Sequence, residues 1–162
     1  MSISIEQTVD ALKTFALGPW GSKSDVVRRE TEKVVAGLQP DAFAGAIGDW
    51  VRAHVQYMHD PIHAEIVPTP EWMMTQIVVR DHCRADGDDI AVLVAAMSLS
   101  IGLEAQFVVV GFKKPGAFEH VFTRVKEPTG LWVAVDPVAG KFDEIFKRVV
   151  DSRVFPIEEP ST

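Results

Sequence analysis

The segment that most constrains the fold is the unbroken apolar run Ile90–Met97. It lies within a predicted helix over Asp88–Ile101, and Gly102 follows where a glycine commonly ends a helix. A helix that is apolar on every side must be buried on every side. The run is too short to cross a membrane, which takes about 18 residues. The other elements of the chain are therefore expected to surround this helix.

The size and composition suit such a buried element. The chain has 162 residues, 47% of them hydrophobic and 24% charged, which predicts one folded domain over residues 1–162 rather than a disordered chain. The net charge of −7 argues against nucleic acid or an anionic membrane as the main partner.

The sequence also indicates a compartment. Cys83 is the single cysteine, so no disulfide can form within the chain, and a reducing environment is expected. The first ten residues, MSISIEQTVD, lack the basic and apolar stretches of a secretory signal. We expect a soluble, cytoplasmic protein.

The region before the buried helix is expected to be helical. Apolar residues recur at helical spacing from Ile5 to Ala16, and a second helix is expected after Ser24 as N-cap. Asp41 is expected to cap a third helix, with an apolar stripe from Phe43 to Tyr57. A short fourth helix is predicted over Glu71–Ile77.

Strands are predicted after the buried helix. Ala105–Gly111 is typical of a central strand, and Phe118–Val125 and Leu131–Val135 are two further strands separated by a turn. Phe142–Phe155 is ambiguous, and we expect a short helix and a last strand there. Helices followed by an antiparallel meander predict an α+β fold.

Three features carry possible chemistry. A polar cluster that contains Cys83 precedes the buried helix, His120 lies in an apolar strand, and Asp136 ends the next strand. A thiolate nucleophile is favoured at a helix N-terminus, where the dipole lowers its pKa. It also needs a histidine base, and that histidine needs a third group to fix its tautomer. Neighbouring strands would bring His120 and Asp136 together.

Each feature also has a purely structural interpretation. A lone cysteine is commonly inert, a strand histidine is commonly a hydrogen-bonded structural residue, and an acidic cluster before a helix is commonly a cap.

Two metal sites are weak alternatives, and we expect neither metal nor cofactor. The first would use His54, His59, His63 and Glu65, but Pro61 prevents a helix there; the second would be a calcium site of Asp81, Asp86, Asp88 and Asp89. Trp50, Trp72 and Trp132 are predicted to be core residues.

Taken together, these segments resemble the transglutaminase-like superfamily. The resemblance rests on DGDDIAVLVAAMSLSIG (86–102), QFVVVGF (106–112), FEHVFTRV (118–125) and GLWVAVDPV (130–138). WVRAHVQYMHDP (50–61), Glu65 and Thr69-Pro70 also fit, so it spans about Val27 to Val138 with its motif core over 86–138. It implies a papain-like cysteine-protease fold, a Cys-His-Asp triad and amide hydrolysis or acyl transfer. The chain is similar to the small members of the superfamily encoded in phages and prophages.

The sequence departs from the family motif at the nucleophile. The motif reads Asp-Cys-Asp-Asp, and alignment on its aspartates places the catalytic cysteine at Gly87, whereas His120 and Asp136 match their family positions. The resemblance therefore implies a catalytically impaired protein with a protein or peptide partner, such as a phage structural or assembly protein, in the cytoplasm or on a phage particle. The alternative is an active cysteine hydrolase that uses Cys83, which would share a helix face with Gly87 if the helix began one turn earlier.

Overall fold

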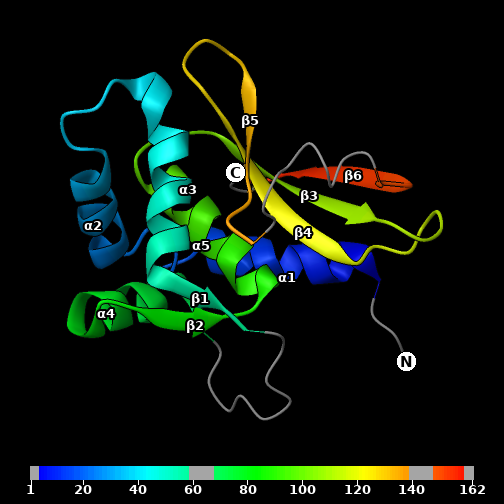
Figure 1. Ribbon diagram of the computed structural model, residues 1–162, viewed down its shortest axis with the longest axis horizontal. Helices are drawn as coiled ribbons and strands as arrows, with labels where there is room; N and C mark the ends of the chain where they lie inside the picture. The colour runs from blue at the N-terminus through cyan, green and yellow to red at the C-terminus, as the bar shows by residue number, and fades with distance from the viewer. Residues whose placement is uncertain (1–3, 59–67, 139–147, 159–162) are drawn as a thin grey trace.

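The computed structural model describes residues 4–58, 68–138 and 148–158, and places helices to one side of an antiparallel sheet (Figure 1). The helices are α1 (Ile5–Leu17), α2 (Asp25–Val35), the 3₁₀ helix η1 (Pro40–Ala42), α3 (Phe43–His54), α4 (Pro70–Arg80) and α5 (Gly87–Ser100). The strands are β1 (Val55–Tyr57), β2 (Cys83–Ala85), β3 (Ala105–Gly111), β4 (His120–Lys126), β5 (Trp132–Val135) and β6 (Asp151–Pro156).

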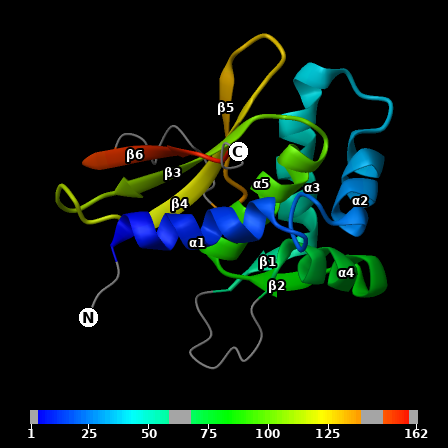
Figure 2. The ribbon, with the colours of Figure 1, turned by 180° about the vertical axis from the view of Figure 1, so that it is seen from behind.

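Helix α5 is the centre of the structure, as its apolar sequence predicts. Every residue from Ile90 to Met97 is at most 3% exposed. Helix α3 lies in front of α5 in Figure 1, and α1 lies in front of it when the molecule is seen from behind in Figure 2. Helices α2 and α4 and strands β3 and β4 also pack on α5. The predicted buried helix is confirmed, and Gly102 follows its C-cap in a left-handed conformation, with φ of 86°.

The larger sheet has the strand order β5-β4-β3-β6, and all three of its pairings are antiparallel. The predicted central strand is β3, which lies between β4 and β6. Side chains alternate across the sheet, so Val109 and Val121 belong to the apolar cluster that includes α1 and α5 residues. Thr123 on the same face donates a hydrogen bond to the carbonyl oxygen of Ala91 in α5, at 2.7 Å.

A second, smaller sheet was not expected from the sequence. Strands β1 and β2 pair in parallel, with Val55 opposite Cys83 and Tyr57 opposite Ala85. Each strand has three residues, too few to show the alternation that predicts a strand. The pairing connects the end of α3 to the start of α5, and so sets the direction in which the chain enters α5.

Two expectations about α3 are wrong. Asp41 does not cap it, because Pro40 opens the 3₁₀ turn η1 and α3 begins behind this turn with no side-chain cap bond. Tyr57 does not continue its apolar stripe, because the helix ends at His54 and Tyr57 lies in β1 with 47% of its surface exposed.

The other elements follow the sequence with small shifts. Ser24 caps α2 as predicted, by accepting a hydrogen bond from the backbone N–H of Val27. Helix α4 continues beyond the predicted Ile77 to Arg80. The predicted last strand is β6, and the short helix expected before it falls mainly on residues 142–147, outside the described residues. Within the described ranges, no helix has the length and apolarity needed to span a bilayer.

The burial of α5 predicts a sharp difference between two valines. Val94 in α5 is fully buried, whereas Val79 in α4 is 72% exposed. Val94→Ala should lower the free energy of unfolding by about 2–3 kcal/mol, through lost burial and a residual cavity. Val79→Ala makes the same chemical change at the surface and should alter it by less than about 0.5 kcal/mol. Urea denaturation of both variants measures this, and equal losses would contradict the central place given to α5.

Candidate active site

The sheet brings His120 and Asp136 together. His120 is the first residue of β4 and Asp136 follows the last residue of β5. Because β4 and β5 run antiparallel, with Thr123 opposite Val135, the start of β4 lies beside the end of β5. The Nε2 atom of His120 lies 2.5 Å from Oδ2 of Asp136. The hydrogen bond expected between the two residues is therefore present.

Both oxygens of the Asp136 carboxylate are held by hydrogen bonds. The Asp136 side chain is 6% exposed and that of His120 is 18% exposed. The second oxygen, Oδ1, accepts a hydrogen bond from the backbone N–H of Val138 at 3.2 Å. With Nε2–H donating to Asp136, the lone pair of a neutral imidazole is on Nδ1. The pair is thus arranged as a base with a fixed tautomer.

The start of α5 is held by two carboxylates. Oδ1 of the N-cap residue Asp86 accepts a hydrogen bond from the N–H of Asp89 at 2.9 Å, and Oδ2 of Asp89 lies 3.5 Å from the N–H of Asp86. This capping box fixes where the helix begins. Burial, followed by the nearby charge of Asp86, raises the pKa of Asp89 from 3.8 to about 7.

Gly87 is the first residue of α5, and neither its backbone nor its neighbours require a glycine there. Its φ is not among the positive values of the structure. A Cβ at this position would find Tyr57 Cε2 as its nearest neighbour, at 3.9 Å, which is an ordinary van der Waals contact. The place that the family motif gives to its cysteine therefore has room for a side chain.

Cys83 has the properties of a core residue. It lies in β2 with 5% of its surface exposed, in the apolar cluster that also holds Val55 and Ile77. Burial, followed by the charge of Asp89, raises the pKa of its thiol to about 11. Since α5 begins at Gly87, Cys83 is not on its first turn, and the shared helix face on which the alternative nucleophile depended does not form. A thiol in this state is protonated near neutral pH.

A cavity of about 390 Å³ lies where the helix start and the histidine meet. Asp88 from the first turn of α5 and His120 from β4 both line it, together with residues of α1 and β3. His120 and the beginning of α5 therefore face a common space. Sequence reasoning did not anticipate the contribution of α1, or Tyr57 beside Gly87, because both come from tertiary packing.

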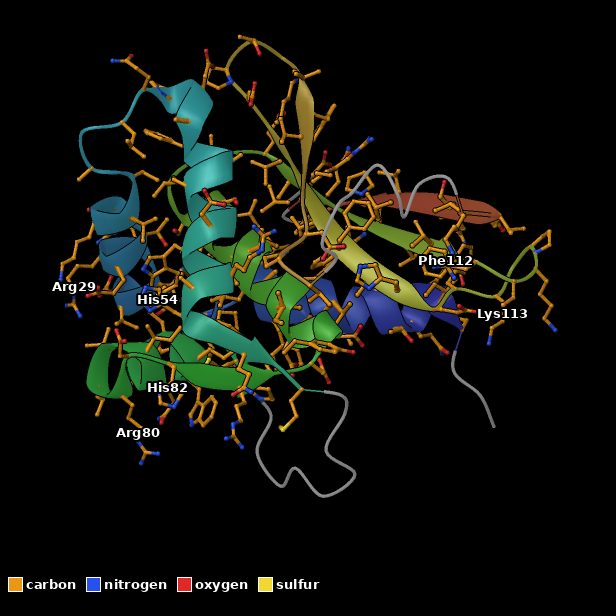
Figure 3. All side chains as sticks on the ribbon, in the orientation of Figure 1. Arg29, His54, Arg80, His82, Phe112 and Lys113 are labelled. Atoms are coloured by element: carbon orange, nitrogen blue, oxygen red, sulfur yellow. The ribbon has the colours of Figure 1, made fainter. Side chains whose placement is uncertain are left out.

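The two other described histidines have backbone partners. Nδ1 of His54 lies 3.0 Å from the carbonyl oxygen of Asp81, and Nδ1 of His82 lies 3.1 Å from that of Arg80. Figure 3 shows both histidines on the side of α3 and α4, far from Phe112 and Lys113, which lead from β3 towards β4.

The weak metal alternatives gain no support. Within residues 4–58, 68–138 and 148–158, no group of three or more histidine, cysteine or acidic side chains is placed to hold a metal ion. His59, His63 and Glu65 lie outside the described residues. Two members of the predicted calcium cluster, Asp86 and Asp89, are instead engaged in the helix cap.

The three tryptophans differ in their surroundings. Trp50 and Trp72 are partly buried against the main apolar cluster, as predicted. Trp132 is not a core residue, which corrects the prediction. It lies near the start of β5, where the guanidinium of Arg124 is stacked 5.0 Å from the centre of its ring.

Comparison with known proteins supports the fold class. No protein-family model matches the chain, and no curated protein matches its sequence. Its structure is similar to a crystal structure from Cytophaga hutchinsonii described as that of a "putative cysteine protease", with a TM-score of 0.57 and 15% sequence identity. The match covers 96% of this chain, which spans 60% of the length of that protein. The chain thus shares the mixed helix-and-sheet fold of that protein; the similarity to phage-encoded proteins stays a prediction.

The burial of Cys83 predicts a thiol that does not react in the folded protein. With its pKa near 11, Cys83 should react with Ellman's reagent at neutral pH about 100-fold more slowly in the native protein than in denaturant. A Cys83→Ala, Gly45→Cys variant serves as the control, because Gly45 is exposed and a Cβ there meets no neighbour within 4 Å. Similar rates for native and unfolded wild type would show that Cys83 is an accessible thiol.

The raised pKa of Asp89 predicts a pH dependence. In the folded protein Asp89 holds its proton up to about pH 7, whereas its ordinary pKa is 3.8. Its stabilising contribution is therefore fully present below about pH 4 and is lost as the pH rises through about 7. The quantity to compare is the melting temperature of the wild type minus that of Asp89→Asn. This difference should be larger at about pH 5 than at about pH 8. Thermal denaturation of both proteins measures this, and a constant difference would refute the raised pKa.

Proposed function

We propose that this chain is a transglutaminase-like domain whose Cys-His-Asp site lacks its nucleophile, and that it binds a protein or peptide without cleaving it. One observation carries the proposal. The 2.5 Å hydrogen bond between His120 and the buried carboxylate of Asp136 lies beside a cavity that also receives the first turn of α5, and this helix begins with Gly87.

The proposed ancestral chemistry follows from the roles of these groups. A cysteine at position 87 would lose its proton to Nδ1 of His120, and the thiolate would attack an amide carbonyl carbon. The oxyanion would accept hydrogen bonds from N–H groups of the first turn of α5. As the C–N bond broke, the protonated His120 would return the proton to the leaving amine, while Asp136 held the ring in place. Glycine has no side chain that could lose a proton or attack a carbonyl carbon, so the present chain is expected to stop at binding.

The alternative, an active hydrolase that uses Cys83, has little in its favour. An attacking sulfur needs solvent access and a lowered pKa, whereas Cys83 is 5% exposed and its pKa is raised to about 11. The Asp89 carboxylate acts in the same direction, because a nearby negative charge opposes formation of the thiolate.

The proposal predicts that a cysteine at position 87 will be activated. In a Cys83→Ala background, Gly87→Cys should fold, since the added Cβ meets only Tyr57 at 3.9 Å. The α5 dipole and the His120–Asp136 pair should lower the pKa of the new thiol, so that iodoacetamide alkylates it at about pH 6 at least about tenfold faster than an ordinary thiol.

Gly45→Cys in the same background is the reference, because it also adds a thiol near the start of a helix, at a glycine that is exposed and whose added Cβ meets no neighbour within 4 Å. Adding His120→Gln to Gly87→Cys keeps a side chain that can donate to Asp136 but removes the base, and should abolish the excess rate. If Gly87→Cys reacts no faster than Gly45→Cys, position 87 is not the nucleophile position and the proposed function fails.

A further inference from the structure

An arginine occupies the face of the larger sheet that is turned away from α5. Thr123 of β4 is bonded to α5, and side chains alternate along a strand, so its neighbour Arg124 lies on the opposite face. Helix α1 covers the α5 side of this sheet, as Figure 2 shows. Among the arginines of residues 4–58, 68–138 and 148–158, Arg124 is the only one that is partly buried, whereas the others are exposed.

Two neighbouring side chains hold the guanidinium of Arg124 in place. Its Nε–H donates a hydrogen bond to Oε1 of Gln106, the residue opposite it on β3, at 2.6 Å. Its central carbon lies 5.0 Å from the centre of the Trp132 ring on β5. The hydrogen bond fixes the plane of the group and the ring covers it from one side. A guanidinium held in this way loses little further freedom when a ligand binds.

Neither of these neighbours neutralises the charge of Arg124. Four of the exposed arginines form ion pairs with carboxylates, namely Arg28, Arg29, Arg52 and Arg153. Arg124 has no such pair among the described residues, and the nearby Lys126 is already paired with Glu104 at 3.2 Å.

The donors that this arrangement leaves define the ligand. With Nε–H engaged by Gln106, the four N–H groups on the two terminal nitrogens of Arg124 have no partner among the described residues. Two of them, one on each nitrogen, are parallel and match the two oxygens of a carboxylate.

We infer that Arg124 is a binding site for the carboxylate of an aspartate or glutamate side chain in a partner polypeptide. The exposed side chains of Val154 and Pro156 share its face of the sheet, because they lie opposite Val108 and Gln106. They offer apolar contact to the residues that flank the acidic one. The net charge of −7 disfavours a multiply charged anion such as phosphate more than a single carboxylate.

Three matched peptides test the inference on the wild-type chain. Acetyl-Val-Glu-Val-amide is titrated into ¹⁵N-labelled protein and followed by NMR, in parallel with acetyl-Val-Gln-Val-amide, which has nearly the same shape without the charge. A third peptide, acetyl-Val-Gln-Val with a free C-terminus, carries its carboxylate on the chain end. The glutamate peptide should shift the Nε–H signal of Arg124 and the indole N–H signal of Trp132. It should bind at least about threefold more tightly than either of the others.

Paired variants separate the parallel donors of Arg124 from the net charge. Arg124→Gln should remove the preference for the glutamate peptide. Arg124→Lys keeps the charge without the two parallel donors, and should bind that peptide more weakly than the wild type does. Arg84→Gln makes the same change in net charge as Arg124→Gln, at an exposed residue of β2 in the other sheet, and should leave all affinities unchanged. The spread of amide signals shows whether each variant is folded. If Arg124→Gln does not fold, the wild-type peptides and Arg124→Lys decide.

Three results would overturn the inference. Equal affinity for the glutamate and glutamine peptides would show that Arg124 only supports the sheet. Equal or tighter binding of the peptide with the free C-terminus would assign the site to a chain end instead of a side chain. Equal effects of Arg124→Gln and Arg84→Gln would place the binding elsewhere. The proposed function is tested separately, by alkylation of Gly87→Cys, so failure of either one is distinguishable from failure of the other.

Discussion

The burial of α5 is the constraint on which the rest of the structure depends. Its residues Ile90–Met97 have no polar side, so helices must cover it from opposite directions and a sheet must close the remaining side. Its first turn reaches the surface, and there the Asp86 and Asp89 side chains form a capping box with the backbone N–H groups of Asp89 and Asp86. The same burial that organises the core therefore leaves one helix end, with its dipole, beside the cavity.

The register of the sheet, and not proximity in the sequence, brings the residues of the site together. Antiparallel pairing of β4 with β5 puts His120 next to Asp136, although sixteen positions separate them. The Thr123 hydroxyl on β4 donates a hydrogen bond to the carbonyl oxygen of Ala91 in α5. This bond fixes the sheet against the helix that carries Gly87. A His-Asp pair held in this way costs the protein an almost fully buried carboxylate, which is offset by hydrogen bonds to both of its oxygens.

The candidate site was partly readable from the sequence. His120 stood out as a histidine within an apolar predicted strand and Asp136 as an aspartate that ends the next one, and neighbouring strands bring such residues together. Gly87 stood out only through the resemblance, because alignment on Asp86, Asp88 and Asp89 places the cysteine of the family motif there. The state of Cys83 could not be read in this way: its burial results from the pairing of β2 with β1, and three-residue strands carry no periodic signal.

The sequence by itself determined the elements whose signal lies within one segment. The apolar run of α5, the Ser24 cap, the Gly102 stop and the strand β3 all depend on neighbours a few residues apart, so they could be predicted. Only the tertiary structure decided which residues from distant parts of the chain surround the site. The α1 wall of the cavity, the place of Tyr57 beside Gly87 and the raised pKa values of Cys83 and Asp89 arise from groups brought together by packing. Burial and charge act through space, and distance in space is what the linear sequence does not contain.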